Sequence, residues 1–134
     1  MTRKVVKKIK RKKVDIKYLG IPNICFSLTD KDDKREKKFV KQRMTRGFDG
    51  SETWNLYGTI ARFILPRLQC FKEVNFGYPM DMTSEEWDKI LDKMINAFEL
   101  IILENKAELE DDGKYKEIDE GLGLFATHFL HLWW

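Results

Sequence analysis

The stretch Met82-Thr83-Ser84-Glu85-Glu86-Trp87 carries the clearest helix-start signal in this chain. A Thr followed three residues later by Glu forms a capping box, in which each side chain bonds the other residue's backbone N–H. Met82 and Trp87 occupy the two positions of a hydrophobic staple around this box. A helix is therefore predicted to begin here and to end near Asn105.

Two apolar patterns downstream of this start predict helices that pack on each other. The first continues the helix from Trp87 at steps of three and four residues, the spacing of an amphipathic helix, through Ile90, Leu91, Met94, Phe98, Ile101 and Ile102. After an acidic loop over residues 108–113, a last helix is predicted from about Tyr115 to the terminus. Its apolar residues are spaced for helix-on-helix packing, and Gly121 and Gly123 are small enough to let another backbone approach closely.

An earlier helix is predicted to begin near Asp49 or Ser51, because Asp49 with Glu52 resembles a second capping box. Its apolar face is formed by Trp54, Tyr57, Ala61, Ile64, Leu65, Leu68 and Phe71. Pro66 falls inside this pattern. Since proline removes a backbone donor and clashes with the preceding turn, at a cost of about 3 kcal/mol, a kink or break is predicted between Arg62 and Leu65.

The front of the chain predicts strands rather than helices. Over residues 14–29, apolar and polar residues alternate on both sides of the turn-forming stretch Gly20-Ile21-Pro22-Asn23, which favours a β-hairpin. Residues 30–44 predict a short, exposed helix, with Asp33 as N-cap and Glu36 three residues on. Residues 1–13 form a basic arm.

Length and composition indicate one domain. The chain has 134 residues, of which 43% are hydrophobic, so residues 14–134 are predicted to form a single, mainly α domain. We expect a three- to four-helix bundle with an N-terminal β-hairpin and the basic arm. No apolar run is long enough to span a bilayer, and no secretory signal follows the basic start, so a cytoplasmic location is predicted. The two cysteines, Cys25 and Cys70, are expected to be reduced.

The charge of the chain is divided between its two halves. Residues 1–46 hold 17 Lys and Arg against 5 Asp and Glu, whereas residues 47–134 hold 8 against 17. The halves therefore carry about +12 and −9, which sum to the net charge of +3. A basic front joined to an acidic, aromatic-rich body indicates an arm that meets nucleic acid or the acidic body of another copy.

The boundary between these halves carries a familiar motif. The stretch Arg46-Gly47-Phe48-Asp49-Gly50-Ser51-Glu52-Thr53-Trp54-Asn55-Leu56 resembles a motif of a family of small, largely uncharacterised phage and prophage proteins, R-G-[FW]-x-[DP]-x-[DE]-[TV]-W-[NS]-[LF]-D. The likeness extends over about residues 44–134. At the final Asp of the pattern this chain has Tyr57. The resemblance implies a viral accessory protein of an infected bacterial host, without a known chemistry.

Arginines beside aromatic residues are the leading binding candidates. Arginine over an aromatic ring is a common means of holding a phosphate, a carboxylate or a base. The candidate contact surface is Arg46, Trp54, Tyr57, Arg62, Arg67 and Tyr78. The structural alternative is that these arginines pair with acids or tie helices together.

No catalytic motif stands out, so no enzyme activity, cofactor or metal is predicted. His128 and His131 lie three residues apart on one helix face, but no companion ligand accompanies them. The adjacent Trp133 and Trp134 at the end of the chain cannot easily both be buried, and an exposed aromatic pair marks an interface or an oligomer contact.

The sequence thus leaves two functional hypotheses open. The first is a non-enzymatic protein with a host-takeover or counter-defence role, which binds a host protein or a small anionic or nucleotide signal stoichiometrically. The alternative is a nucleic-acid-binding accessory protein that uses the basic arm, through phosphate contacts from Arg3, Lys4, Lys7, Lys8, Lys10, Arg11, Lys12 and Lys13.

Overall fold

The computed structural model describes residues 24–133, and this part of the chain is mainly helical, as predicted. It contains four α-helices, α1 (Glu36–Arg46), α2 (Leu56–Val74), α3 (Ser84–Asn105) and α4 (Lys114–Thr127), and two short 3₁₀ helices, η2 (Gly50–Thr53) and η3 (Phe129–His131). None of the helices in residues 24–133 has the length and apolarity needed to cross a bilayer.

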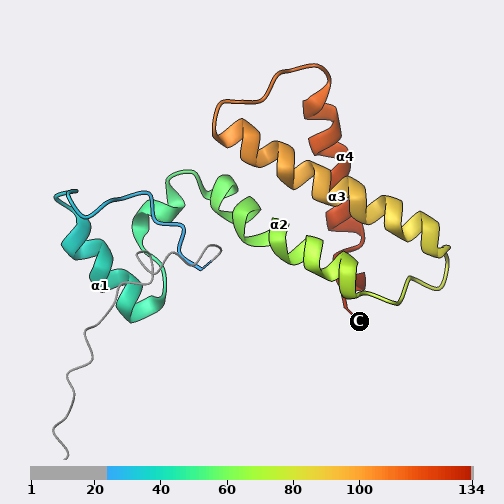
Figure 1. Ribbon diagram of the computed structural model, residues 1–134, viewed down its shortest axis with the longest axis horizontal. Coiled ribbons are helices and arrows are strands. Elements are labelled where there is room, and N and C mark those ends of the chain that lie inside the picture. Colours follow the sequence, from blue (N-terminus) through green and yellow to red (C-terminus); the bar gives the residue numbers. More distant parts are fainter. Residues whose placement is uncertain (1–23, 134) are drawn as a thin grey trace, which may run out of the picture.

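The helices divide into two regions (Figure 1). In the first, which we call the helical layer, α3 lies in the middle and packs against α2 and α4. In the second, the N-terminal region (residues 24–55), α1 packs against η2, and η2 in turn contacts α2. The bundle therefore contains three helices, and α1 lies at the other end of an elongated molecule.

The core of the helical layer is apolar. Leu91, Met94 and Ala97 of α3 are completely or almost completely buried, and Ala61 of α2 and Ile118 of α4 pack from the two sides. Full burial of one such aliphatic side chain stabilises a fold by about 1.5–3 kcal/mol. The periodicity of the sequence therefore identified the faces that meet.

The predicted start of α3 is confirmed in detail. Thr83 is the N-cap, its side chain accepts a hydrogen bond from Glu86 N, and the Glu86 carboxylate accepts one from Thr83 N. Trp87 is buried and Met82 packs against the core, as the staple requires. The helix ends at Asn105, also as predicted.

Gly121 is where α4 comes closest to α3. A Cβ atom at this position would lie 2.3 Å from Ala97 Cβ and 2.4 Å from the Lys93 carbonyl oxygen. Such distances are far below van der Waals contact, so only glycine permits this approach. Gly123, two residues on, has nothing within 4 Å of the same position. The predicted close approach is thus confirmed at one of the two glycines.

A kink or break was predicted between Arg62 and Leu65, and the break is absent, because α2 runs from Leu56 through Pro66 to Val74 as one helix. Contacts with α3 on both sides of the proline, from Ala61 and Leu68, hold the helix together across the missing hydrogen bond. In the turn before the proline, Arg67 Nη1 also donates to the Phe63 carbonyl oxygen at 2.8 Å. Packing therefore outweighs the local cost of the proline.

Three other boundaries differ from the predictions. The Asp49 capping box starts η2, and α2 begins only at Leu56. Helix α1 begins at Glu36 with Arg35 as N-cap and no side-chain cap, since arginine has no acceptor, and the Asp33 carboxylate accepts the Arg35 backbone N–H at 2.8 Å. Helix α4 ends at Thr127, after which the chain tightens into η3 and brings His128 and His131 against the Trp87 ring.

The predicted β-hairpin is not found in the described residues. Residues 14–23 and the basic arm lie outside them, and residues 25–29 form no strand. Instead, the backbone N–H groups of Phe26 and Leu28 donate to side chains of η2. The alternation of apolar and polar residues over 24–28 therefore belongs to a segment whose backbone N–H groups bond side chains of Glu52 and Ser51.

Candidate functional site

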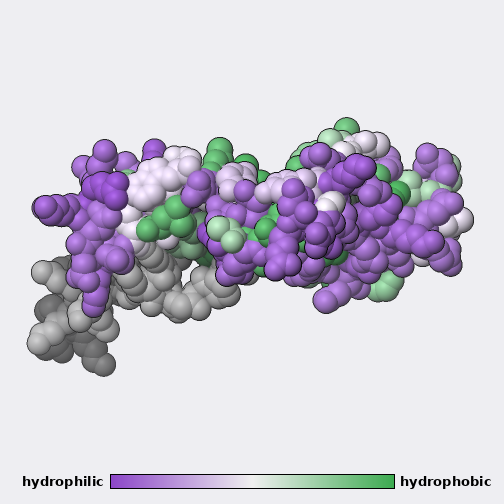
Figure 2. All heavy atoms as spheres, turned by 90° about the horizontal axis from the view of Figure 1, so that it is seen from above, coloured by the Kyte–Doolittle hydropathy of each residue, from purple (hydrophilic) through white to green (hydrophobic). Residues whose placement is uncertain are grey.

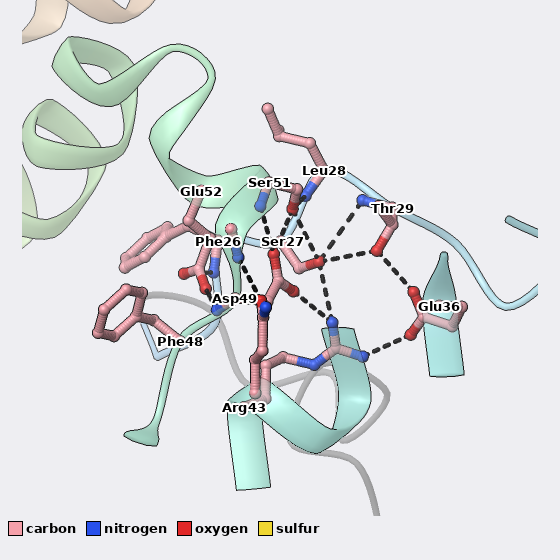
Figure 3. A network of polar contacts seen from close by, with 12 residues as sticks. Phe26, Ser27, Leu28, Thr29, Glu36, Arg43, Phe48, Asp49, Ser51 and Glu52 are labelled. Carbon is pink, nitrogen blue, oxygen red and sulfur yellow. Dashed lines mark hydrogen bonds and ion pairs between the residues drawn. The ribbon is translucent and has the colours of Figure 1, made fainter. Parts of the chain in front are cut away.

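A buried ionic network forms the interior of the N-terminal region (Figure 3). The Arg43 guanidinium of α1 lies between two carboxylates and forms ion pairs with Glu36 and Asp49. It also donates to Ser27 Oγ at 3.1 Å, and Thr29 Oγ1 donates to the Glu36 carboxylate at 2.6 Å. All three charged side chains are nearly inaccessible to solvent.

The same network fastens residues 26–29 to η2. Glu52 accepts the backbone N–H of Asp49 at 2.7 Å with one oxygen and that of Phe26 at 3.0 Å with the other. Ser51 Oγ accepts the backbone N–H of Leu28 at 2.9 Å. The predicted Asp49–Glu52 capping box is therefore present, and it holds a segment more than twenty residues earlier in the chain.

Hydrogen bonding keeps Asp49 ionised in this buried position. Burial opposes its charge, but hydrogen bonds from Ser27, Ser51 and Arg43 outweigh burial and hold the pKa of Asp49 below its ordinary value. Each charged side chain of the network forms an ion pair or a hydrogen bond with another residue of the network. We therefore assign the network to folding, which gives Asp49, Ser51 and Glu52 a structural role.

A turn in the left-handed conformation leads into this network. Gly47 ends α1 with φ +86°, and its N–H donates to the Arg43 carbonyl oxygen. A residue with a Cβ atom is strained at this angle. The Arg-Gly pair of the motif thus ends α1 and turns the chain toward Asp49.

An exposed apolar surface follows one side of α2. Leu56, Ile60 and Phe63 recur at four- and three-residue steps, which places them on one helix face. Each is 45–50% exposed. Arg67 continues the face and its guanidinium lies 3.8 Å from the centroid of the Phe63 ring. We call these four residues the α2 stripe.

Further arginine–aromatic stacks lie next to the α2 stripe in the N-terminal region. Arg35 lies over the Trp54 ring at 4.6 Å, and Arg46 over the Phe48 ring at 4.3 Å. Trp54 also packs edge-on against Phe39. Seen from above, hydrophobic residues interrupt the hydrophilic surface where the two regions meet (Figure 2). Arginine and large aromatic residues therefore gather around the start of α2.

The structure brings some of the predicted contact residues together and separates others. Arg46, Trp54 and Tyr57 lie in or beside the N-terminal region, and Arg67 lies on the α2 stripe. Arg62 instead donates to Asn105 Oδ1 at 3.1 Å and ties α2 to α3, as in the structural alternative. Tyr78 lies beyond the opposite end of α2, in the loop between α2 and α3.

That loop forms an open pocket of about 670 Å³ together with the end of the described chain. Its main side chains are apolar or aromatic: Phe76, Tyr78, Met80, Trp87, His131 and Trp133. Trp87 is buried, and its indole N–H has no acceptor among the described residues. Met80 and Phe76 are almost fully exposed. We call this the loop pocket.

The remaining candidates give no further site. His128 and His131 approach each other with 3.1 Å between their Nδ1 atoms, and no group of three metal-ligating side chains occurs within residues 24–133. The proposed nucleic-acid contacts between Arg3 and Lys13 lie outside that range, as does Trp134. Trp133, the other member of the terminal pair, is largely exposed on the loop pocket.

Sequence reasoning missed several residues that these surfaces depend on. Arg43 is the central cation of the buried network, yet it lies in residues 30–44, which were predicted to form a solvent-exposed helix. Ile60 was overlooked because it falls outside the apolar face that packs on α3. Phe76 and Met80 flank the loop stretch Gly77-Tyr78-Pro79, where the only signal for a binding surface was the high density of large apolar residues.

Comparison of the chain with protein-family models, curated proteins and solved structures gives no match.

Proposed function

We propose that this protein acts without catalysis, by stoichiometric binding of a partner protein through the α2 stripe and the arginine–aromatic stacks beside it. The observation that carries the proposal is the row Leu56, Ile60 and Phe63, half exposed on a continuous helix and continued by Arg67. Aromatic residues and arginine dominate the binding energy of protein interfaces. An arginine already stacked on a ring also loses less side-chain freedom on binding.

The arrangement favours a protein partner over a small anionic ligand. A nucleotide or similar anion needs several cationic groups converging on one enclosed site. The three predicted arginines are each engaged separately: Arg46 with the Phe48 carbonyl, Arg62 with Asn105, and Arg67 with the Phe63 carbonyl. The loop pocket is lined by no arginine or lysine. An extended, partly apolar surface is suited to another protein surface.

The viral context belongs to the proposal as well and rests on the sequence resemblance alone. A small protein with no enzymatic activity of its own interferes with a host by occupying the surface of a host protein. Host takeover or counter-defence is the role that such stoichiometric binding serves.

The test is whether a defined complex depends on the α2 stripe. The full chain is expressed with an affinity tag in bacterial cells, and native mass spectrometry gives the composition and stoichiometry of what is isolated. An Ile60→Glu, Phe63→Glu double variant is expected to lose the partner, since two carboxylates placed in an apolar interface remain without compensation. Its melting temperature establishes that it still folds.

The matched control is Lys116→Glu on the exposed surface of α4, which changes the net charge by the same amount. The proposal requires a discrete heteromeric complex that the wild type and Lys116→Glu form and the stripe variant does not. Recovery of no heteromeric complex, or of one that the stripe variant retains, would overturn it. Arg67→Ala is a milder third variant, expected to weaken the complex by about tenfold, the loss of a moderate hot spot.

A further inference from the structure

The loop pocket lies at the end of α2 that is distant from the N-terminal region. Its floor is Trp87, which is 2% exposed, and its margins are Phe76, Met80 and Trp133, which are 93%, 103% and 75% exposed. Single exposed apolar residues are ordinary, but several of them around one cavity mark a binding surface. The volume of about 670 Å³ is in the range that buries several side chains of a ligand.

Two features describe what this pocket would bind. Asp81 lines the pocket, and the stretch of residues 71–92 that builds most of it has a net negative charge, with six acidic side chains against two lysines. One lysine, Lys72, is already paired with Asp92. The cavity wall itself is apolar or aromatic, from Phe76, Tyr78 and Met80. The fitting occupant is an aliphatic, strongly cationic peptide segment.

The chain contains one segment of that description. Residues 1–13, MTRKVVKKIKRKK, hold eight basic and no acidic residues, and Val5, Val6 and Ile9 are spaced between them. Helix α2 separates the two ends of the molecule by about 28 Å, since 19 residues rise 1.5 Å each. The first described residues pack on η2 at one end, and the loop between α2 and α3, which lines the loop pocket, lies at the other end of α2 (Figure 1). The arm of a neighbouring molecule can reach the loop pocket without crossing this distance.

We propose that the basic arm of one copy docks into the loop pocket of a second copy, with its aliphatic residues in the cavity and its lysines against the acidic surroundings. The contact joins two different surfaces. Head-to-tail contacts of this kind produce rings or open chains instead of being limited to symmetric dimers. The arm would then be an assembly element, and the α2 stripe would remain available for the partner protein.

A charge-swap experiment with the full-length protein tests this assembly. Sedimentation velocity over a range of protein concentrations, after removal of nucleic acid at high salt, is expected to show species larger than the 16.0 kDa chain. Pocket reversal by Asp81→Lys and Asp88→Lys is expected to weaken the association by at least about tenfold, and arm reversal by Lys7→Glu and Lys8→Glu is expected to do the same. Mixing the two variants is expected to restore association, because the reversed pocket then meets the reversed arm.

Two further variants complete the test of the assembly. Met80→Ser removes an apolar pocket side chain without changing charge and is expected to weaken association, while Lys116→Glu on α4 serves as a reversal away from the pocket. A protein that stays monomeric at all concentrations would overturn the proposal. So would association that is insensitive to pocket reversal or not restored on mixing, including an assembly that forms only around nucleic acid. Neither result bears on the α2 stripe, whose test is the heteromeric complex.

Discussion

The two regions of this molecule are held together by opposite means. The helical layer buries aliphatic and aromatic side chains along α3, whereas the N-terminal region buries the ion pairs of Arg43 with Glu36 and Asp49. Apolar burial is favourable wherever volume and shape fit. A buried charge is tolerated only when its partners are in place, because its desolvation costs several kcal/mol.

This difference shows how a short region with few apolar residues reaches a defined structure. Helix α1 is highly charged and contributes only Phe39 as a buried apolar residue. Its position is set by the geometry of the guanidinium, whose planar fork of donors fits only one arrangement of two carboxylates and a hydroxyl. We expect the N-terminal region to open more readily than the helical layer, since its stability depends on few groups and its contact with the layer runs through η2 and α2.

The largest effect is expected from removing the central charge of the network. Arg43→Met leaves Glu36 and Asp49 buried and unpaired, which should cost about 3–5 kcal/mol of folding free energy in the N-terminal region. Hydrogen exchange should show lost protection in residues 26–54 and retained protection in α3. Arg46→Met, the same exchange at an exposed position, is the control. Equal exchange rates in both variants would contradict the assigned role of Arg43.

The next largest effect compares two glycines of α4. Gly121→Ala should destabilise the helical layer by about 1–3 kcal/mol, because the new methyl group overlaps the Lys93 carbonyl and Ala97. Gly123→Ala should instead stabilise it by up to about 1 kcal/mol, since alanine is the better helix former and the space is open. Urea denaturation measures both. Similar effects of the two substitutions would mean that α4 does not approach α3 at Gly121.

A smaller effect is expected from acid. The pKa of Asp49 is lowered in the folded state, so the native protein binds fewer protons than the unfolded chain as the pH falls. Its contribution is complete above the unfolded value of about 4 and is lost as the pH falls through the folded value. Unfolding free energies measured from pH 6 to pH 3 should decrease at the acid end. An Asp49→Asn variant that shows the same acid dependence would place its origin elsewhere.

The smallest effect is expected at the surface of the helical layer. Lys93 pairs with Glu120 between α3 and α4, and both side chains are about half exposed. Exposed ion pairs contribute only about 0–1 kcal/mol, so Lys93→Ala should lower the folding free energy by no more than about 1 kcal/mol. A double-mutant cycle with Glu120→Ala measures the coupling, and a value comparable to the effect of Arg43→Met would remove the contrast between the two regions.

Local sequence signals predicted the helical layer well. The capping box at Thr83 and the spacing of Trp87, Leu91, Met94 and Phe98 depend on neighbours within one or two turns, so they could be read directly. The second capping box, Asp49 with Glu52, was read correctly for the same reason. Its role in holding residues 26–29 was not predicted, because Glu52 accepts the backbone N–H of Phe26, which lies 26 residues earlier and which no local rule connects to it.

The amino-acid sequence by itself determined that this protein is mainly helical, where α3 begins and ends, and that another backbone could approach α4 closely at Gly121 or Gly123. These features follow from periodicity, capping and the absence of a side chain, which act over a few residues. Only the tertiary structure decided that α2 continues through Pro66 and that Arg43 is buried. It also separated the predicted contact residues into the N-terminal region, the α2 stripe, the Arg62–Asn105 link and the loop pocket. Each of these results depends on partners distant in the chain, whose combined packing and electrostatics outweigh local preference.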